Sequence, residues 1–338
     1  MSILPAFLNR TAALRPFFED DTITEIEVNG PSDVWIMRQG SRYATRAELT
    51  RPLATDTLHD IADLIAHHSK QQTSATNPLL AATIPADLTG AEGWDYRFQY
   101  VQPPAVPAGT VSITIRKPSR LEFDLDYYVK SGAFSRINEP LPEQEDDERL
   151  VRDAHAGKDW PAFFKLIMKA RKNILVSAAT NTGKSAFINM LMTLANPEER
   201  VVTLEDAREI RLSKQKNVVH LLYSRGQQGV AKVSPVELME ATLRMSPDRV
   251  IPGELRGAEA YVALEMLNSG HDGWLSTIHA KSPAHMWDRL AQMVMRFGTP
   301  MMRAEIIEYA KGLIDVVIQM HRFDDGLRGV REVWYAGH

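Results

Sequence analysis

Apolar and polar positions in the first third of the chain follow both a helical and an alternating period, which together predict a mixture of helices and strands. Apolar side chains recur at helical spacing over residues 3–18, and a second helix is predicted over residues 57–68. Short runs bounded by Gly, Pro and Asn predict strands at residues 23–28, 33–38, 42–45, 95–101 and 110–116. These elements predict an α+β domain that covers residues 1–120.

The first predicted helix is amphipathic, because Ile3, Phe7, Leu14, Phe17 and Phe18 recur at roughly helical spacing. The favoured interpretation is a helix that packs on its own domain through this apolar face. The alternative is that the same face contacts a membrane surface or a partner protein.

Prolines and a dense run of acidic residues set the next part of the chain apart. Pro118, Pro140 and Pro142 interrupt any regular pattern, and residues 143–148 read Glu-Gln-Glu-Asp-Asp-Glu. A charge run of this kind is typical of a solvated face, so we assign it no chemistry. We predict a linker over residues 121–150, about which the two flanking domains move.

Beyond residue 150 the pattern changes to helices that alternate with apolar, β-branched runs, which is typical of a parallel α/β sheet. The predicted strands cover residues 173–177, 201–205, 218–223, 249–251 and 274–278. The predicted helices start at Lys184, Pro235, Gly257 and Pro283. We therefore predict an α/β fold for residues 151–338, with a mostly parallel, doubly wound sheet of the kind that binds nucleotides.

Composition narrows the class of protein. The 338 residues include no cysteine, which excludes disulfides, thiolate catalysis and cysteine-ligated metal sites. No uncharged apolar run approaches the ~18 residues of a membrane span, and no secretory signal pattern opens the sequence. The formal net charge of -4 argues against a general nucleic-acid binder, and no motif gives direct evidence for one. We expect a soluble, cytoplasmic protein.

The strongest chemical signal is an apolar strand that runs into a loop ending Gly183-Lys184-Ser185, followed by a helix. Backbone N–H groups at the start of that helix supply fixed positive dipoles for phosphate oxygens. Lys184 adds a full charge between the β- and γ-phosphates, and the Ser185 hydroxyl is a hard oxygen ligand for Mg²⁺. The predicted nucleotide-binding residues are Ala178, Ala179, Thr180, Asn181, Thr182, Gly183, Lys184, Ser185 and Ala186.

Carboxylates follow two of the predicted strands, at the strand ends where such sheets bind ligands. Glu205 and Asp206 close one strand, and Glu254 comes shortly after another. A carboxylate there can orient or deprotonate water near Mg²⁺, since γ-phosphate transfer needs positioning more than covalent help. Arg249 and Arg256 bracket Glu254, where they can pair with carboxylates or with a neighbouring subunit's nucleotide.

A histidine lies at the end of the last predicted strand. His279 follows Ser276 and Thr277, which should lie in the same sheet as the phosphate loop. There it can hydrogen-bond a γ-phosphate, and loss of that bond on hydrolysis would report the nucleotide state. The alternative is a structural histidine whose hydrogen bonds are satisfied within the fold.

Taken together and in this order, the segments resemble the hexameric traffic ATPases of bacterial type IV secretion and conjugation, the VirB-eleven class. The matching segments are the phosphate loop AATNTGKS, the acidic box TLEDAREI, the Walker B box LRMSPDRVIPGELRG and the histidine box SGHDGWLSTIHA. The early segments ITEIEVNGPSDVWI and SITIRKPS, and the end from IDVVIQM through REVWY, are also similar to that class. The resemblance covers essentially the whole chain and implies a RecA-like P-loop domain in its C-terminal part.

The resemblance also implies a role for each candidate residue, with ATP and Mg²⁺ as cofactors. By this resemblance Lys184 and Ser185 hold the phosphates and Mg²⁺, and Glu205 lies near the attacking water. Glu254 is the Walker B acid, which reaches the metal through water. His279 couples nucleotide state to conformation.

Two arginines of the N-terminal domain reach the γ-phosphate in this family, and the resemblance places them at Arg97 and Arg116, on the strand pair before the linker. Positive charge from such a domain would stabilise the transition state. The chain departs from the family at two positions of the phosphate loop, where Ala178 and Asn181 replace glycines. Asparagine tolerates left-handed backbone, whereas Ala178 adds a methyl group close to the phosphates.

The function that these motifs favour is an ATPase that powers substrate translocation or pilus assembly in a type IV secretion or conjugation system. The family implies a homo-hexamer that works with the inner-membrane ATPases and channel components of the secretion apparatus, with peripheral contact at the cytoplasmic face of the inner membrane as an option. Two alternatives stay open: a nucleotide-gated binding module with little turnover, suggested by the altered loop, and a type II secretion or pilus motor.

Overall fold

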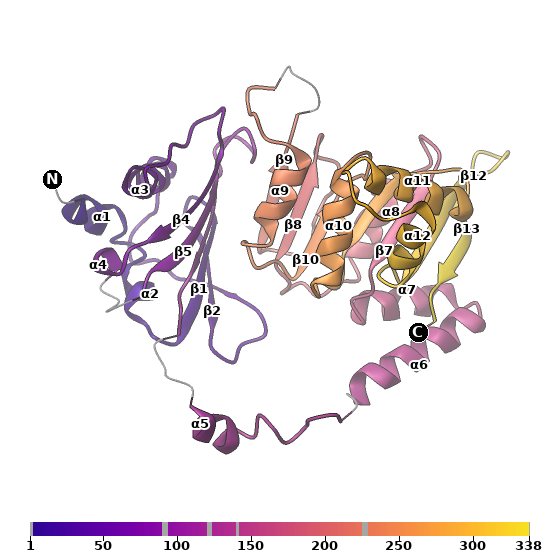
Figure 1. Ribbon diagram of the computed structural model, residues 1–338, viewed down its shortest axis with the longest axis horizontal. Helices are drawn as coiled ribbons and strands as arrows, with labels where there is room; N and C mark the ends of the chain where they lie inside the picture. Colours follow the sequence, from indigo (N-terminus) through magenta and orange to yellow (C-terminus); the bar gives the residue numbers. More distant parts are fainter. Residues whose placement is uncertain (1–2, 90–93, 120–123, 140–141, 225–228, 338) are drawn as a thin grey trace.

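The computed structural model describes residues 3–89, 94–119, 124–139, 142–224 and 229–337. In the N-terminal half, six strands form one antiparallel sheet in the order β3-β2-β1-β6-β5-β4 (Figure 1). The strands are β1 (Ile23–Gly30), β2 (Asp33–Arg38), β3 (Thr45–Arg46), β4 (Leu79–Ile84), β5 (Tyr96–Val101) and β6 (Ser112–Arg116). Helix α3 (Thr55–His68) buries one apolar stripe against this sheet, as its 3.6-residue period predicts.

The single helix predicted over residues 3–18 is broken in two. Helix α1 (Leu4–Arg10) ends at Thr11, whose hydroxyl donates to the Phe7 carbonyl at 2.7 Å. Helix α2 (Arg15–Glu19) then starts with a proline in its first turn. Phe7, Leu14 and Phe18 are buried in the core of the N-terminal half, so the apolar face packs on its own domain, as the favoured interpretation had it.

Three further elements of the N-terminal half differ from the sequence-based expectations. Strand β4 and the short helix α4 (Ala86–Thr89) were not predicted, and β3 lies at Thr45–Arg46 instead of residues 42–45. Strand β4 lies at an edge of the sheet, and inward and outward positions alternate only weakly along it.

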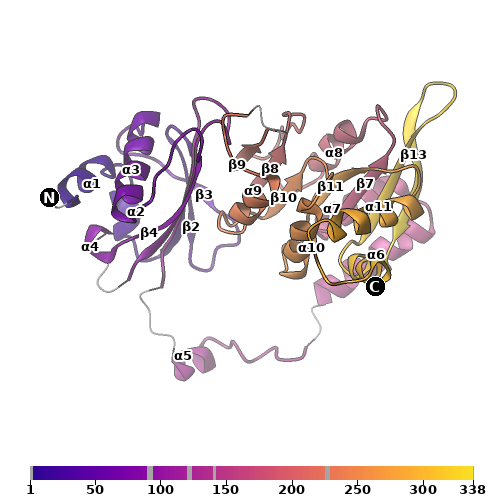
Figure 2. The same ribbon diagram turned by 45° about the horizontal axis from the view of Figure 1, so that its top comes forward.

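The predicted linker contains regular structure. Helix α5 (Leu125–Lys130) has no buried residue and lies apart from both sheets (Figure 2). Helix α6 (Pro142–Ala156) contains the acidic run and packs on α7 (Trp160–Lys169). Asp147 forms an ion pair with Lys169 at 2.8 Å, and Glu148 pairs with Lys172. The boundaries at residues 120 and 150, and the motion expected about this segment, stay predictions.

In the C-terminal half, the predicted parallel strands all form, and two more strands follow them. The order is β10-β8-β9 in one sheet and β11-β7-β12-β13 in the other. The two sheets are joined next to β10 and β11. Leu255, three residues after the end of β10, forms an isolated bridge with Ile278 on β11, and the Ser276 hydroxyl donates to the Pro252 carbonyl at 2.6 Å. The strands are β7 (Ile174–Ala178), β8 (Val201–Glu205), β9 (Val218–Leu222), β10 (Arg249–Pro252), β11 (Leu275–His279), β12 (Val316–Arg322) and β13 (Arg328–Tyr335).

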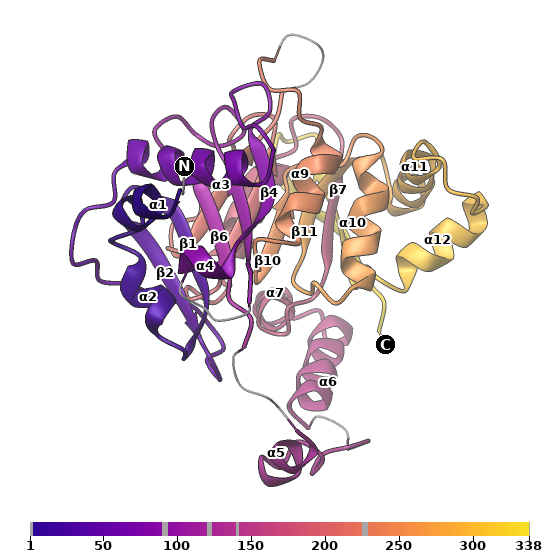
Figure 3. The ribbon, with the colours of Figure 1, turned by 60° about the vertical axis from the view of Figure 1, so that its left-hand side comes forward.

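Helices cover both faces of this sheet because successive strand residues point to opposite sides. In β7, Ile174 and Val176 pack with α7 and α8 (Lys184–Met192), whereas Leu175 belongs to the core of the other face. That other face carries α9 (Pro235–Thr242), α10 (Glu259–Asn268), α11 (Pro283–Met295) and α12 (Arg303–Lys311) (Figure 3). Among the described helices, none is long and apolar enough to cross a membrane.

The two halves are joined by a buried polar network centred on Arg200. This side chain, 1% exposed, donates to Glu27 Oε2 at 3.0 Å and to Asn29 Oδ1 at 3.0 Å, both on β1. It also donates to Asn217 Oδ1 at 2.6 Å and to the Met245 carbonyl at 2.8 Å in the C-terminal half. One guanidinium group therefore bonds to both halves, away from water.

Candidate functional site

The phosphate loop predicted from the sequence has the expected local structure. Strand β7 ends at Ala178, and α8 begins at Lys184. Between them Asn181 has a φ of 59° and Gly183 a φ of 90°, the left-handed conformations in which glycine and asparagine are tolerated. Ala178 is a buried strand residue and is not among the positive-φ residues, so its backbone does not require glycine.

Lys184 is a buried residue, 8% exposed, although it follows a loop directly. Its Nζ lies 3.1 Å from His279 Nδ1 and 3.4 Å from the Ala179 carbonyl oxygen. Burial lowers the pKa of the ammonium group, and the charge of Glu254 partly opposes that change. The ammonium group of Lys184 is thus held next to the predicted phosphate loop by the Ala179 carbonyl and by His279.

A cavity of about 380 Å³ brings most of the predicted residues together. It is lined by the loop itself and by the ends of β8, β10 and β11, as expected at the carboxyl edge of a parallel sheet. Its lining residues are Thr180, Asn181, Thr182, Gly183, Lys184, Ser185, Ala186, Ile188, Glu205, Asp206, Ala207, Glu209, Ile210, Gly253, Glu254, Arg256, Thr277 and His279.

His279 connects the phosphate loop to the acid after β10. Its Nε2 lies 3.3 Å from Glu254 Oε1, and its Nδ1 faces the ammonium of Lys184. Because an ammonium group can only donate, Nδ1 accepts and the ring proton belongs on Nε2, towards Glu254. Burial lowers the pKa of His279, which favours this neutral form.

Arg256, the arginine beside Glu254, pairs with two carboxylates of its own chain. Arg256 donates to Glu254 Oε2 at 2.6 Å and to Asp206 Oδ2 at 2.8 Å. These bonds raise the pKa of the guanidinium further. Arg249, the other arginine near Glu254, is buried and pairs with Glu199, so it does not reach the cavity.

Glu205 both faces the cavity and holds the loop that follows β8. Its Oε1 accepts the backbone N–H groups of Glu209 and Ile210, each at 2.8 Å. Its Oε2 is buried and, among the described atoms, has no hydrogen-bond partner. Burial raises the pKa of this carboxyl above its ordinary value. A Cβ at Gly253 would lie 3.1 Å from Glu205 Cγ, so glycine permits the close approach of β10.

Two residues at the site were missed by sequence reasoning. Glu209 accepts a hydrogen bond from the Ser185 hydroxyl, although the acidic box that contains it was recognised. Arg328, on β13, donates to Asn181 Oδ1 at 3.0 Å. No motif marks Arg328, because its position depends on how the last hairpin folds back over the loop.

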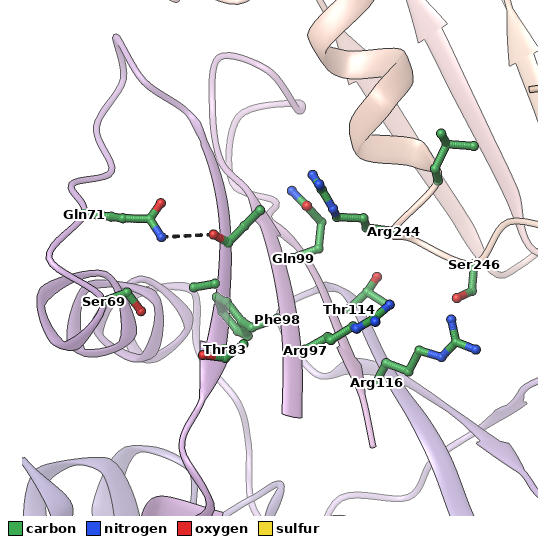
Figure 4. A pocket seen from close by; sticks show the side chains of 13 residues that line it. Ser69, Gln71, Thr83, Arg97, Phe98, Gln99, Thr114, Arg116, Arg244 and Ser246 are labelled. Carbon is green, nitrogen blue, oxygen red and sulfur yellow. Dashed lines mark hydrogen bonds between the residues drawn. The ribbon is translucent and has the colours of Figure 1, made fainter. Parts of the chain in front are cut away.

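Arg97 and Arg116 do not line this cavity, and their expected contact with a γ-phosphate stays a prediction. They line a separate cavity of about 600 Å³ between the N-terminal sheet and the turn after α9, together with Arg244 (Figure 4). The two cavities have no lining residue in common. Within one chain, these arginines and the phosphate loop therefore face different spaces.

Comparison with known proteins identifies the family. Residues 154–320 match the family model described as type II/IV secretion system protein. A type IV secretion system protein VirB11 from Bartonella quintana is 33% identical over 341 residues, which cover 97% of this chain and 92% of that protein. The chain belongs to the VirB11 family of type IV secretion ATPases.

Other relatives agree with this membership. A type IV secretion system protein PtlH homologue from Bordetella bronchiseptica is 36% identical over 328 residues, covering 96% of this chain and 93% of the relative. The crystal structure of the VirB11 ATPase from the Brucella suis type IV secretion system, in complex with sulphate, matches with a TM-score of 0.87. That match has 29% identity and covers 98% of this chain and 95% of the other.

Membership of the VirB11 family confirms the function favoured by the sequence, a type IV secretion ATPase, over the gated module and the type II motor. The mixed α/β fold is also confirmed. The individual roles of the site residues are not tested by these likenesses and are taken up as proposals below.

Proposed function

We propose that this VirB11-family chain binds ATP with Mg²⁺ in the cavity around Lys184 and hydrolyses the γ-phosphate to drive type IV secretion. The observation that carries the proposal is the convergence of the phosphate loop, the buried Glu205, the partly buried Glu254 and His279 on one cavity. We further propose that the C-terminal half is a RecA-like, doubly wound domain, since parallel strands, helices on both faces and the loop after β7 suit that fold.

The donor groups at this cavity fit Mg²⁺ and a triphosphate. Three residues that line the cavity can each offer one oxygen atom to a metal: Ser185, Glu205 and Glu254. The Glu205 Oε2 and Glu254 Oε1 atoms are buried, and neither has a hydrogen-bond partner among the described atoms. The described residues contain no cluster of three His, Asp or Glu side chains placed to hold a metal. Single oxygen ligands suit Mg²⁺, which keeps waters and phosphate oxygens in its shell. When bound, Mg²⁺ would neutralise charge on the β- and γ-phosphates.

In this proposal the chain's own groups exchange partners when nucleotide binds. The Lys184 ammonium would leave His279 Nδ1 for the phosphate oxygens, and Ser185 would release Glu209 to bind the metal. Glu254 would act on the metal through water, and Glu205 would orient the attacking water with its unpartnered oxygen. His279 Nδ1 would lose its donor when Lys184 moves to the phosphates, and the ring would pass this change to Glu254 through its Nε2 proton.

Charge balance points to a second subunit. Glu254 and Asp206 neutralise Arg256, so Lys184 is the one side-chain cation of the cavity lining that stays available for phosphate among the described residues. Transfer of a γ-phosphoryl group gains most from additional cations. We propose that Arg97 and Arg116 of a neighbouring subunit supply them in a homo-hexamer. Such a ring would work with inner-membrane ATPases and channel components at the cytoplasmic face of the membrane.

Phosphate release under steady-state conditions tests the site. Lys184→Ala should abolish turnover, whereas Lys165→Ala, a matched change at an exposed lysine of α7, should leave it unchanged. Because Lys184 is buried, a melting curve must show that its variant is folded. Wild-type turnover by Lys184→Ala would disprove the phosphate-binding role of the loop.

Glu254→Gln separates binding from chemistry. It removes the negative charge and nearly keeps the shape, so a fluorescent ATP analogue should bind with the wild-type affinity while turnover falls at least ~100-fold. Loss of both binding and turnover, with a lower melting temperature, would show instead that Glu254 mainly holds His279 and Arg256 in place.

A further inference from the structure

The cavity between the two halves of the chain is a concentration of positive charge. Its volume is about 600 Å³, and three arginines line it: Arg97 on β5, Arg116 on β6, and Arg244 in the turn between α9 and β10. Figure 4 shows Arg244 on the C-terminal side of the cavity and the other two arginines on the strands facing it. All three side chains are exposed.

These charges are only partly balanced within the chain, through the charge of Glu25 opposite Arg116. Arg97 and Arg116 are directly opposite each other in the antiparallel pair β5–β6, and like charges in that position destabilise a sheet. In the described part of the chain, no carboxylate forms an ion pair with either of them or with Arg244. The nearest carboxylate in the same row, Glu25 beside Arg116, is buried and bonded to Ser246. The cavity therefore presents three guanidinium groups to a ligand with negative charge.

Arg244 is held in place against the N-terminal sheet by the residues that follow it. Ser246 has a φ of 49°, an uncommon conformation for a side chain other than glycine, asparagine or aspartate. This conformation aims its hydroxyl at Glu25 Oε1 on β1, at 2.5 Å. The Met245 carbonyl accepts from Arg200, which also bonds Glu27 on β1. The turn thus fixes the backbone at Arg244 relative to β1 before any ligand arrives.

We propose that Arg244 completes a three-arginine site, with Arg97 and Arg116, for the triphosphate that a second copy of this chain holds in its phosphate loop. This inference rests on the proposed function and adds Arg244 to it as a residue that contacts the phosphates. Three forked, planar donors suit the spread charge of a triphosphate, which lone lysines would match less well. Within one chain the two cavities share no lining residue, so the proposal names the loop of a second copy as the source.

Turnover and binding test Arg244 against a matched control. Arg244→Ala should lower kcat at least ~tenfold, since a single arginine that reaches the transferred phosphoryl group is worth ~10³–10⁵ in other nucleotide hydrolases and two others remain here. Arg289→Ala, at an exposed arginine of α11, should not change it. Arg244→Lys should recover part of the loss, because it restores charge without the fork. Wild-type kcat in the Arg244→Ala protein would overturn the inference.

Mixing two variants distinguishes a site shared between copies from one within a copy. Arg244→Ala keeps an intact phosphate loop, and Lys184→Ala keeps all three arginines. Combined before assembly, they should hydrolyse ATP faster than the sum of the separate proteins, because intact halves meet in mixed rings. If Arg97→Ala/Arg116→Ala mixed with Lys184→Ala shows this gain and Arg244→Ala does not, only the role of Arg244 fails. If neither mixture gains, the shared site itself fails.

Binding without hydrolysis gives an independent measurement. A fluorescent, non-hydrolysable ATP analogue should bind assembled rings of Arg244→Ala several-fold more weakly than rings of wild type, and dilute monomers of the two equally. Inorganic tripolyphosphate should bind wild-type monomers no better than Arg97→Ala/Arg116→Ala/Arg244→Ala monomers. Tight, Arg244-dependent binding of tripolyphosphate to monomers would overturn the inference, since the cavity would then bind free polyphosphate by itself.

Discussion

Replacing Arg200 by Met should destabilise the contact between the two halves of the chain far more than the loss of one surface charge would. The guanidinium and the Glu27 carboxylate are 2% and 1% exposed, and they lie 3.0 Å apart. Met fills much of the arginine's volume, so the change removes charge and hydrogen bonds without a large cavity. It leaves the buried Glu27 and Asn217 and the partly buried Asn29 without their shared donor.

The magnitude follows from the cost of an unpaired buried charge. Removal of one partner of a buried ion pair typically costs about 3–5 kcal/mol, because the remaining charge stays desolvated. Burial already raises the pKa of Glu27 to about 7 despite the charge of Arg200. Since this pKa is above the unfolded value, protonated Glu27 stabilises the fold at low pH and that contribution is lost as pH rises through 7. Without Arg200 the pKa rises further, so the destabilisation should be larger at pH 8 than at pH 6.

Urea unfolding followed by circular dichroism and tryptophan fluorescence measures both effects. Arg200→Met should lower the free energy of unfolding by about 3–5 kcal/mol at pH 8 and by less at pH 6. The double variant Arg200→Met/Glu27→Gln should regain part of the loss and show a weaker dependence on pH. A loss below about 1 kcal/mol at pH 8, or one independent of pH, would refute the assignment of Arg200 as the charge partner of a buried Glu27.

Three further outcomes follow from the site. Ala178→Gly should lower stability by about 1 kcal/mol and leave binding of a fluorescent ATP analogue unchanged, because Ala178 is a buried strand residue; tighter binding would show that its methyl group crowds the phosphates. Turnover should fall as pH drops below 6.5, since protonation of His279 places a second cation against Lys184, and a pH profile of His279→Gln should lack this acid limb. Arg328→Ala should raise KM for ATP a few-fold at unchanged kcat, because it removes one hydrogen bond to Asn181; an unchanged KM would mean that the loop keeps its conformation without Arg328.

Local signals predicted much of the fold. Apolar periodicity predicted four strands of the N-terminal half, β1, β2, β5 and β6, and all five strands that were expected in the C-terminal half. The phosphate loop was equally predictable, because a strand, a loop that ends Gly-Lys-Ser and a helix start are consecutive in sequence. Pro16 lies in the first turn of α2 and indicates that a new helix begins there. The apolar period continues across this point, which is why a single helix was predicted over residues 3–18.

Burial and side-chain positions that depend on contacts distant in sequence could not be predicted from local patterns. Lys184 contacts His279, which is 95 residues later in the chain, and is buried. No local sequence pattern predicts this burial. The separation of Arg97 and Arg116 from the phosphate loop depends on which face of the N-terminal sheet docks on the C-terminal half. That docking is set by single polar residues such as Arg200, which look like surface charges in the sequence.

The network around Arg200 has a consequence for dissecting the protein. Buried partners of the C-terminal half are supplied by β1, and backbone bonds cross the same boundary, from Leu222 N–H to the Ala105 carbonyl and from Lys232 N–H to the Thr76 carbonyl. A fragment that starts at α6 would contain every residue of the phosphate loop and still lack part of its own interior. The C-terminal half can therefore be recognised as a unit in the sequence, but we expect it to lose stability when it is isolated from β1.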